Sequence, residues 1–258
     1  MIRLERTAQV WCICGNLGGG KTLTAVSMAV EAIRTGYYVV SNVTIDTQAL
    51  SKSIPHASAL YQHIVVHNEE YDDQGNVVNV EDFNPFTIPS GSPRGTVGGK
   101  LVLVILDECA EWFDQYANAR SPMLRRVMSW LRHTSKRSQD VVFIVQRREY
   151  LNKNFRILVS RWVFVDDLAV WRMPIFHLPV PFCGGFCMAN VFDKVGTRVQ
   201  SVTFISKYRF GQFYNTAECL SSFGGESSEY QLPKSESKFP FLLFMIWLAS
   251  SLALVLLF

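Results

Sequence analysis

The sequence predicts an α/β fold in which a parallel β-sheet is flanked by helices, followed by a small β-rich extension and a single C-terminal transmembrane helix. Three observations predict this fold. Over residues 1–170, short apolar runs alternate with segments of helical periodicity, which is typical of a parallel sheet covered by helices. Beyond that point, prolines and glycines interrupt the chain and two β-rich runs follow. The last 20 residues carry no charge.

The chain is expected to have four parts. Hydrophobic residues make up 48% of its 258 positions and charged residues 18%, so it can build a sizeable core, and global disorder is excluded. The net charge of +3 is too small to indicate nucleic-acid binding by itself. The parts are a core at 1–170 with a polar loop insertion at 68–99, a β-rich extension at 171–220, a polar Ser-rich linker at 221–238 and a transmembrane helix at 239–258.

Strands and helices are expected to alternate within the core. Gly36 is placed to end the first helix, and Pro122 follows Ser121 as the first residue of the second helix. The run at 100–106 is the most continuously apolar and predicts a central strand buried on both faces. Within the insertion, residues 74–76 predict a hairpin turn. Core strands are expected at 8–14, 37–45, 64–67, 100–106, 140–145 and 161–165, helices at 21–35, 122–137 and 149–160, and extension strands at 198–208 and 210–214.

A phosphate-binding motif lies between the first expected strand and the first expected helix. Residues 15–22 match the pattern G-x-x-x-x-G-K-[ST] in full, which predicts a P-loop with ATP as its ligand. Glycines let such a loop curl so that its backbone N–H groups face the phosphates. Lys21 would reach the β- and γ-phosphates, and the Thr22 hydroxyl would bind Mg²⁺. The predicted binding residues are Gly15, Asn16, Leu17, Gly18, Gly19, Gly20, Lys21 and Thr22.

Two acidic residues, Asp107 and Glu108, follow the expected central strand. In P-loop enzymes an acid at the end of a buried strand completes the metal shell, so Asp107 is the second predicted Mg²⁺ ligand. Glu108 would orient or deprotonate the attacking water, and its presence favours hydrolysis over mere phosphate binding. The alternative is an acidic cluster that only offsets the dipole of a following helix.

Three further residues are candidates for catalysis. Gln146 ends the expected strand at 140–145, where its amide would sense the γ-phosphate; the alternative is an ordinary polar residue at a strand end. Arg125 and Arg132 share one flank of the helix at 122–137, and either would serve a neighbouring subunit as an arginine finger. This predicts a homo-oligomer, typically a closed ring. The alternative is a solvated basic face.

The C-terminal segment at 239–258 reads FPFLLFMIWLASSLALVLLF. As a helix it would be about 30 Å long, which is the thickness of the hydrocarbon core of a bilayer. Lys234 and Lys238 precede it and no charge follows, so the positive-inside rule places residues 1–238 in the cytoplasm. The segment is therefore predicted to cross a membrane once; the alternative is a buried core helix.

With these motifs in place, the chain resembles the zonula occludens toxin (Zot) family, which includes the assembly ATPases of filamentous bacteriophages. The resemblance covers about residues 8–220 and implies a cytoplasmic ATPase domain, one span across the inner membrane of a bacterial host, and cooperation with an outer-membrane channel to extrude virions. It also implies that Lys21, Thr22, Asp107 and Glu108 form the hydrolytic centre. The segments that carry it are GNLGGGKTLTAVSMAVEAI (15–33), VILDECAEWF (104–113), LRHTSKRSQDVVFIVQ (131–146) and FGQFYNTAECL (210–220).

The moved substrate stays open at this point. Long family members continue past the span into a periplasmic domain, whereas this sequence ends at Phe258, so a separate periplasmic or outer-membrane partner is expected. Alternatively, related P-loop ATPases package DNA into membrane-containing icosahedral phages, and the protein would then belong to the virion membrane. The moved substrate is thus phage coat protein or DNA. A third hypothesis is a non-hydrolysing, nucleotide-gated membrane scaffold that recruits coat protein.

Overall fold

A computed structural model describes residues 2–4, 9–71, 77–93, 96, 99–108, 122–170 and 185–214. These residues belong to one compact unit, Met1–Asn215. A second unit, Thr216–Phe258, contains the expected linker and transmembrane helix and lies outside the described residues. In the described part of the chain, no helix is long and apolar enough to cross a membrane.

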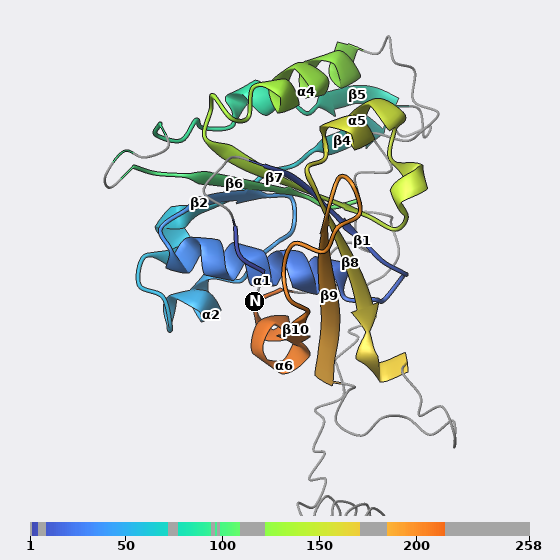
Figure 1. The fold of residues 1–258 in the computed structure, drawn as a ribbon. Coiled ribbons are helices and arrows are strands. Elements are labelled where there is room, and N and C mark those ends of the chain that lie inside the picture. Colours follow the sequence, from blue (N-terminus) through green and yellow to red (C-terminus); the bar gives the residue numbers. More distant parts are fainter. Residues whose placement is uncertain are drawn as a thin grey trace, which may run out of the picture. The chain divides into compact units, whose positions relative to one another are not determined.

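The unit is built on one mixed sheet of eight strands in the order β10-β9-β8-β1-β7-β6-β2-β3 (Figure 1). From β8 to β3 every neighbouring pair is parallel, as predicted, whereas β9 and β10 are antiparallel to their neighbours. The strands are β1 (Val10–Cys14), β2 (Tyr38–Ser41), β3 (Tyr61–His63), β6 (Val102–Leu106), β7 (Gln139–Val145), β8 (Arg161–Asp167), β9 (Phe186–Asp193) and β10 (Thr203–Ser206).

Helices cover both faces of this sheet, and each face has its own apolar core. On one face α1 (Lys21–Arg34) buries nearly its whole length, because Val26, Val30 and Ile33 pack on the inward side chains of the central strands. Gly36 ends this helix as predicted, with a positive φ of 86°. On the other face lie α4 (Pro122–Arg132) and α5 (Lys153–Leu158) (Figure 1). Two short helices, α2 (Thr47–Ser51) and α6 (Lys207–Phe210), complete the α1 side.

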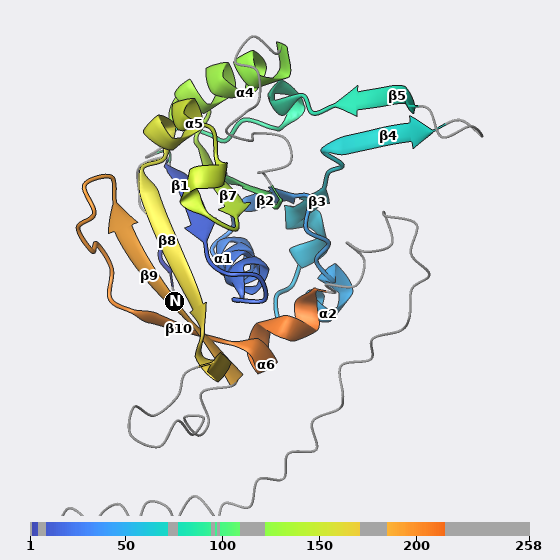
Figure 2. The same ribbon diagram turned by 90° about the vertical axis from the view of Figure 1, so that its right-hand side faces the viewer.

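The insertion at 68–99 contains regular structure. Strands β4 (His67–Tyr71) and β5 (Val77–Asp82) pair antiparallel, which agrees with the predicted hairpin, although its turn lies outside the described residues. Figure 2 shows this hairpin projecting away from the main sheet. The segment that follows is fixed to the core, because Arg137 donates a hydrogen bond to the carbonyl of Ile88 (2.6 Å) and Gln139 donates one to that of Pro89 (2.8 Å).

Three predicted elements have different bounds. The third strand is 61–63 rather than 64–67, because the polar edge residues pair with β2 while the apolar residues that follow turn into the core. The helix expected at 149–160 is a 3-10 turn and then α5, since the Asn152 side chain caps a new helix by accepting a hydrogen bond from the backbone N–H of Asn154. The helix expected at 122–137 ends at Arg132, and turns lead into β7.

The expected β-rich extension is described only at 185–214. Its strands β9 and β10 add to the edge of the main sheet beside β8 rather than forming a separate layer. The strand expected at 198–208 is only 203–206, and the one expected at 210–214 is instead the end of α6 and a 3-10 turn. Residues predicted to lie on either side of a boundary at 170 therefore share one sheet.

Candidate nucleotide-binding site

The predicted P-loop leaves the carboxyl end of β1 and enters α1. A tight turn closes it, in which the backbone N–H of Gly19 donates to the carbonyl of Asn16 at 2.9 Å. Two positions have left-handed backbone angles, with φ of 70° at Gly18 and 88° at Gly20. Residues with a Cβ avoid this region, so glycines permit the shape of the loop.

The loop is also held closely against β8 and β9. A Cβ on Gly15 would collide with the backbone carbonyl oxygen of Val165, and one on Gly20 would collide with Sγ of Cys187. Burial raises the pKa of the Cys187 thiol to about 11, against the opposing effect of the Lys207 ammonium. Lys207 in turn binds both carboxylate oxygens of Asp167 at 2.7 Å, which links α6 to the end of β8.

Lys21 is the first residue of α1 and closes the loop from the inside. Its ammonium donates to the carbonyl of Asn16 at 2.9 Å. Burial lowers the pKa of Lys21, while the negative charges of Asp107 and Glu108 oppose this shift. The Lys21 ammonium thus binds a carbonyl of the loop and lies near enough to Asp107 and Glu108 for their charges to raise its pKa.

Thr22 and Asp107 meet although 85 positions separate them in the sequence. The Thr22 hydroxyl donates to Oδ2 of Asp107 at 2.7 Å. Burial raises the pKa of Asp107, and three interactions oppose the shift: the Thr22 hydrogen bond, the Glu108 backbone N–H and the charge of Lys21. A hydroxyl beside a carboxylate is a hard oxygen donor pair, which suits Mg²⁺ that keeps its remaining ligands from water and phosphate.

Glu108 directly follows Asp107 and has a strained backbone. Its φ is 54°, in the left-handed region that costs a non-glycine residue roughly 1–3 kcal/mol. Its backbone N–H donates to Oδ1 of Asp107 at 2.8 Å, and its side chain is exposed at the same end of the sheet. The strained backbone of Glu108 thus occurs where the Asp107 carboxylate is held by hydrogen bonds and the Glu108 side chain is exposed.

Gln146 lies beside the loop because of the strand order. β7 runs between β1 and β6, so its carboxyl end falls between the P-loop and the acidic pair. The backbone carbonyl of Gln146 accepts a hydrogen bond from the N–H of Gly15 at 3.2 Å, and its side chain is exposed. A role for its amide in sensing the γ-phosphate stays a prediction.

The two candidate arginines are not part of this cluster. Arg125 and Arg132 are exposed on α4, which packs on the face of the sheet opposite α1. Arg132 ends α4 shortly before β7 begins, so it lies toward the edge of the sheet opposite the loop. A role for either arginine in a neighbouring subunit remains a prediction.

The structure adds two residues that sequence reasoning missed. The side chain of Asn42 binds the backbone of Asp107 twice, accepting from its N–H at 2.7 Å and donating to its carbonyl at 3.1 Å. Asn42 follows β2, the neighbour of β6, so its place at a carboxyl strand end was a usable signal. Tyr214 pairs with Ile45 in an isolated bridge. Burial raises the pKa of Tyr214 to about 12, and the charges of Cys187 and Asp107 act in the same direction.

Comparison with known proteins relates this chain to bacteriophage proteins. Residues 10–179 match the sequence family described as Zonular occludens toxin (Zot). The chain is similar to the Gene 1 protein of Enterobacteria phage I2-2, with 26% identity over 179 residues, 68% of this chain and 43% of that protein. The Gene 1 protein of Salmonella phage IKe matches with the same identity and coverage. The chain thus spans less than half the length of these relatives.

Among solved structures, the chain matches the N-terminal domain of zonular occludens toxin from Neisseria meningitidis. It covers 81% of this chain and 100% of that domain, with 16% identity and a TM-score of 0.48.

Proposed function

Because the chain belongs to the Zonular occludens toxin (Zot) family, we propose that it is a membrane-anchored P-loop ATPase that drives bacteriophage virion assembly and export across the inner membrane of its host. The proposal has a chemical part, which concerns residues at the candidate site, and a biological part, which concerns the membrane and the moved substrate. The two parts are separable by experiment.

The hydrogen bond between Thr22 and Asp107 carries the chemical part. It joins the loop motif to the end of β6 at 2.7 Å, as required if both side chains serve one metal ion. If the glycine-rich motif were a chance match, its Thr22 would not be expected to contact a carboxylate that follows β6, which lies two strands away from β1 in the sheet. Loop, acid and strand order together favour nucleotide hydrolysis.

In the proposed reaction, backbone N–H groups of residues 15–22 cradle the phosphates of ATP. Lys21 releases the Asn16 carbonyl and binds the β- and γ-phosphate oxygens, neutralising charge that develops during transfer. Thr22 and Asp107 would hold Mg²⁺, which when bound offsets the negative charge of the phosphates. Asn42 fixes the backbone of Asp107 and so positions that carboxylate.

Glu108 is the proposed general base. Its exposed carboxylate lies next to Asp107, where it accepts a proton from the water that attacks the γ-phosphate. Gln146, at the neighbouring strand end, orients this water through its amide. An arginine from a second copy, Arg125 or Arg132, would complete the site, so the active form is proposed to be a homo-oligomeric ring.

The biological part concerns what the ATPase moves and where it is anchored. Residues 239–258 are proposed to cross the inner membrane once, with the nucleotide site in the cytoplasm. The moved substrate is phage coat protein or DNA, and a separate periplasmic or outer-membrane partner would extend the path outward. Family membership and the uncharged C-terminal segment support this part.

The test of the chemical part is steady-state ATP hydrolysis together with binding of a fluorescent ATP analogue. Glu108→Gln is expected to bind the analogue and lose turnover, whereas Lys21→Ala is expected to lose binding or turnover. Glu31→Gln, on the distant end of α1, is the matched control and should behave as the unchanged protein. Normal turnover by Glu108→Gln would show that the base is wrongly assigned. Absence of any hydrolysis in the unchanged protein would favour the scaffold hypothesis.

A further inference from the structure

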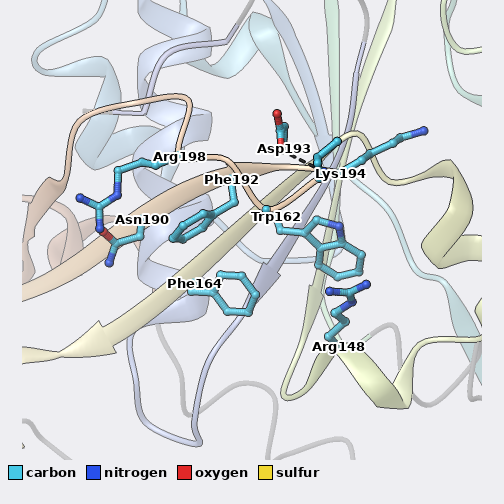
Figure 3. Close-up of a pocket in the computed structure, with 10 residues that line it drawn as sticks. Arg148, Trp162, Phe164, Asn190, Phe192, Asp193, Lys194 and Arg198 are labelled. Atoms are coloured by element: carbon cyan, nitrogen blue, oxygen red, sulfur yellow. Dashed lines mark hydrogen bonds between the residues drawn. The ribbon is translucent and has the colours of Figure 1, made fainter.

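The outer face of strands β8 and β9 holds a hollow that the nucleotide site does not use. Its volume is about 390 Å³. It lies on the face of the sheet opposite α1, because side chains alternate along each strand: Val163 and Val165 point to the α1 core, while Trp162 and Phe164 point outward. Aromatic, cationic and amide side chains line it, namely Arg148, Trp162, Phe164, Asn190, Phe192 and Arg198 (Figure 3).

Aromatic rings form the floor of this hollow; Trp162 is buried, whereas Phe164 remains accessible. Phe164 is 38% exposed and meets Phe192 edge to face, with ring centroids 5.7 Å apart. The row continues onto the next strand, where Phe204 is 61% exposed and lies opposite Met188 of β9. Exposed rings on a sheet face are unusual for residues that serve only the core, and they offer flat surfaces for stacking.

Two arginines stand at the ends of the aromatic row. The Arg148 guanidinium lies over the Trp162 ring, 4.9 Å from its centroid, and that of Arg198 lies over Phe192 at 5.8 Å. In Figure 3 the rings of Phe164 and Phe192 lie between Arg198 and the Arg148–Trp162 pair. Trp162 and Phe192 thus each have a guanidinium group over one ring face. These two guanidinium groups lie at the rim, where they can bind an anion or stack on a base.

The charge around the hollow is mostly positive. Lys194 lines it together with the arginines, and a second hollow that shares Arg148, Trp162 and Lys194 adds Lys153 and Arg156. The carboxylate of Asp193 is used within its own turn, where it accepts from the backbone N–H groups of Val195 (2.9 Å) and Thr197 (2.8 Å). Asp193 keeps its negative charge and the Lys194 ammonium donates to the Ile157 carbonyl at 3.0 Å, so the rim has a net positive charge rather than an unbroken row of cations.

Asn190 also lines the hollow and is 9% exposed. Within the described part of the chain its Oδ1 has no hydrogen-bond partner, but this atom is itself buried, so it is not open to a ligand.

We propose that this face binds a single-stranded nucleic acid. Its phosphates would lie on the cationic rim, which includes Arg148 and Arg198, and its bases would stack on the exposed ring of Phe164. A duplex fits less well, because its bases are already stacked on one another. Cations at both ends of the aromatic row favour a polyanion over a second, similarly basic copy of this chain. DNA and RNA single strands share this chemistry.

The biological meaning of this binding site rests on the proposed function. The polymer that the ATPase would move is then a single-stranded nucleic acid. The fold also suggests a route between the two sites. Phe164 is followed by Val165, whose carbonyl lies against Gly15 of the P-loop. A strand bound on the outer face of β8 therefore lies one sheet thickness away from the phosphate-binding loop.

The test measures binding of the full chain, in detergent and without nucleotide, to fluorescein-labelled oligonucleotides of about 16 nucleotides. Oligo-dT and oligo-U are compared with a duplex of equal length by fluorescence anisotropy across a salt series. Single strands of at least one kind are expected to bind more tightly than the duplex. Preference for dT or for U then identifies the natural strand.

Two variants separate stacking from charge. Phe164→Ala is expected to weaken binding by about 5- to 150-fold with little change in salt dependence, since one stacked base is lost. Arg148→Ala combined with Arg198→Ala is expected to weaken binding and to reduce the slope of log K against log salt by about 1.4. Phe86→Ala, at a ring that is 44% exposed elsewhere, and Arg34→Ala, on α1, are the matched controls and should keep full affinity.

Several outcomes would overturn the inference. These are unchanged affinity in both test variants, equal or tighter binding of the duplex, and loss of a dimer or larger oligomer in the variants without loss of oligonucleotide binding. Thermal melts of each variant show whether it is folded, and a variant that melts early is replaced by Phe164→Leu or Arg198→Gln. ATP hydrolysis is measured in parallel. Hydrolysis without oligonucleotide binding would contradict this inference alone. Oligonucleotide binding without hydrolysis would contradict the proposed ATPase activity.

Discussion

A glycine can be needed for its left-handed backbone or because a Cβ would collide with a neighbour. Gly36, which follows α1, and Gly20, in the P-loop, separate these two reasons. Gly36 and Gly20 have nearly the same φ, 86° and 88°, but only Gly20 has a neighbour, Cys187, where a Cβ would lie. A substitution at Gly36 therefore measures backbone strain alone. The same substitution at Gly20 adds a collision to that strain.

Alanine at these two glycines is expected to destabilise to different extents. Gly36→Ala should lower the free energy of unfolding by about 1–2 kcal/mol, the cost of a left-handed residue with a Cβ. Gly20→Ala should cost a further 1–3 kcal/mol or so from overpacking and should also weaken ATP binding. Urea denaturation measures both values. Adding Cys187→Ala to Gly20→Ala should recover part of the difference, and equal losses at both glycines would show that Cys187 does not support the loop.

Asn42 is expected to act as a positioning residue for Asp107. Asn42→Ala removes both hydrogen bonds to the Asp107 backbone, so kcat should fall about 10- to 100-fold and the Mg²⁺ concentration for half activity should rise, with little change in KM for ATP. Steady-state kinetics with Mg²⁺ titration measures this. Asn84→Ala, which removes a hydrogen bond in an exposed turn, is the control. A loss confined to thermal stability would reduce Asn42 to a structural role.

The buried carboxyl of Asp107 is expected to make stability depend on pH. Because its pKa is raised above the ordinary 3.8, the folded protein holds this proton more tightly than the unfolded chain does. The free energy of unfolding therefore falls as pH rises from 3.8 through the raised pKa. Asp107→Asn lacks this loss, so its stability relative to the unchanged protein should increase with pH and then level off. Urea denaturation at a series of pH values from 3.8 upward, without nucleotide, tests this sign.

At the scale of elements, prediction succeeded where the pattern is local. The apolar run of β6 and the helical spacing of α1 are each readable from their own residues, and both elements have the expected bounds within a few positions. β9 was not predicted from the sequence, because its residues alternate between a buried face under α1 and the face that lines the outer hollow. Cys187, Ala189 and Val191 pack under α1, whereas Phe192 helps to line the outer hollow. Only the neighbouring strand explains such a pattern.

Gln139 contributes to the connection between the insertion and the core, beside the hydrogen bond from Arg137 to the Ile88 carbonyl. At the start of β7, the Gln139 side chain accepts from the Trp130 indole N–H at 2.7 Å and donates to the Pro89 carbonyl at 2.8 Å. Gln139→Leu leaves the Trp130 indole N–H and the Pro89 carbonyl without this hydrogen-bond partner, so it should lower the free energy of unfolding by about 1–3 kcal/mol. Faster hydrogen exchange at 83–93 should accompany it. Gln62→Leu, at an exposed glutamine bound to Tyr38, is the control, and equal effects would contradict the anchoring role.

At the scale of the whole molecule, membrane attachment rests on the sequence of residues 239–258, which lie outside the described structure. A chain lacking them is expected to move from the membrane pellet to the soluble fraction after ultracentrifugation, because about 20 apolar residues supply the insertion free energy. The shortened chain should keep its ATP hydrolysis. Sedimentation that does not change would exclude the predicted span as the anchor.

The family, the parallel part of the sheet and the local motifs of the site were predictable from the sequence, whereas contacts between distant segments were not. The resemblance to the Zot family is confirmed by the match over residues 10–179. The motif at 15–22 and the acid at 107 could be found because their chemistry demands particular residues in a particular order, and the structure joins them through Thr22. The hollow on β8 and β9 arises from strand neighbours that are distant in the sequence, and the end of β2 indicates a site role for Asn42 only once β6 is known to be its neighbour. The catalytic roles of Glu108, Gln146 and the arginines stay predictions.

The contact between Gly20 and Cys187 also has a consequence for the timing of synthesis. The complete phosphate-binding motif is made by residue 22, but the strand that supports it, β9, ends only at Asp193. At about 5–20 residues per second, roughly 10–30 s separate the two on the ribosome. During that interval the nascent chain carries the motif without its supporting wall. The loop geometry of the folded protein therefore requires synthesis up to residue 193, and a nascent chain that ends before β9 presents the same motif in an unsupported form.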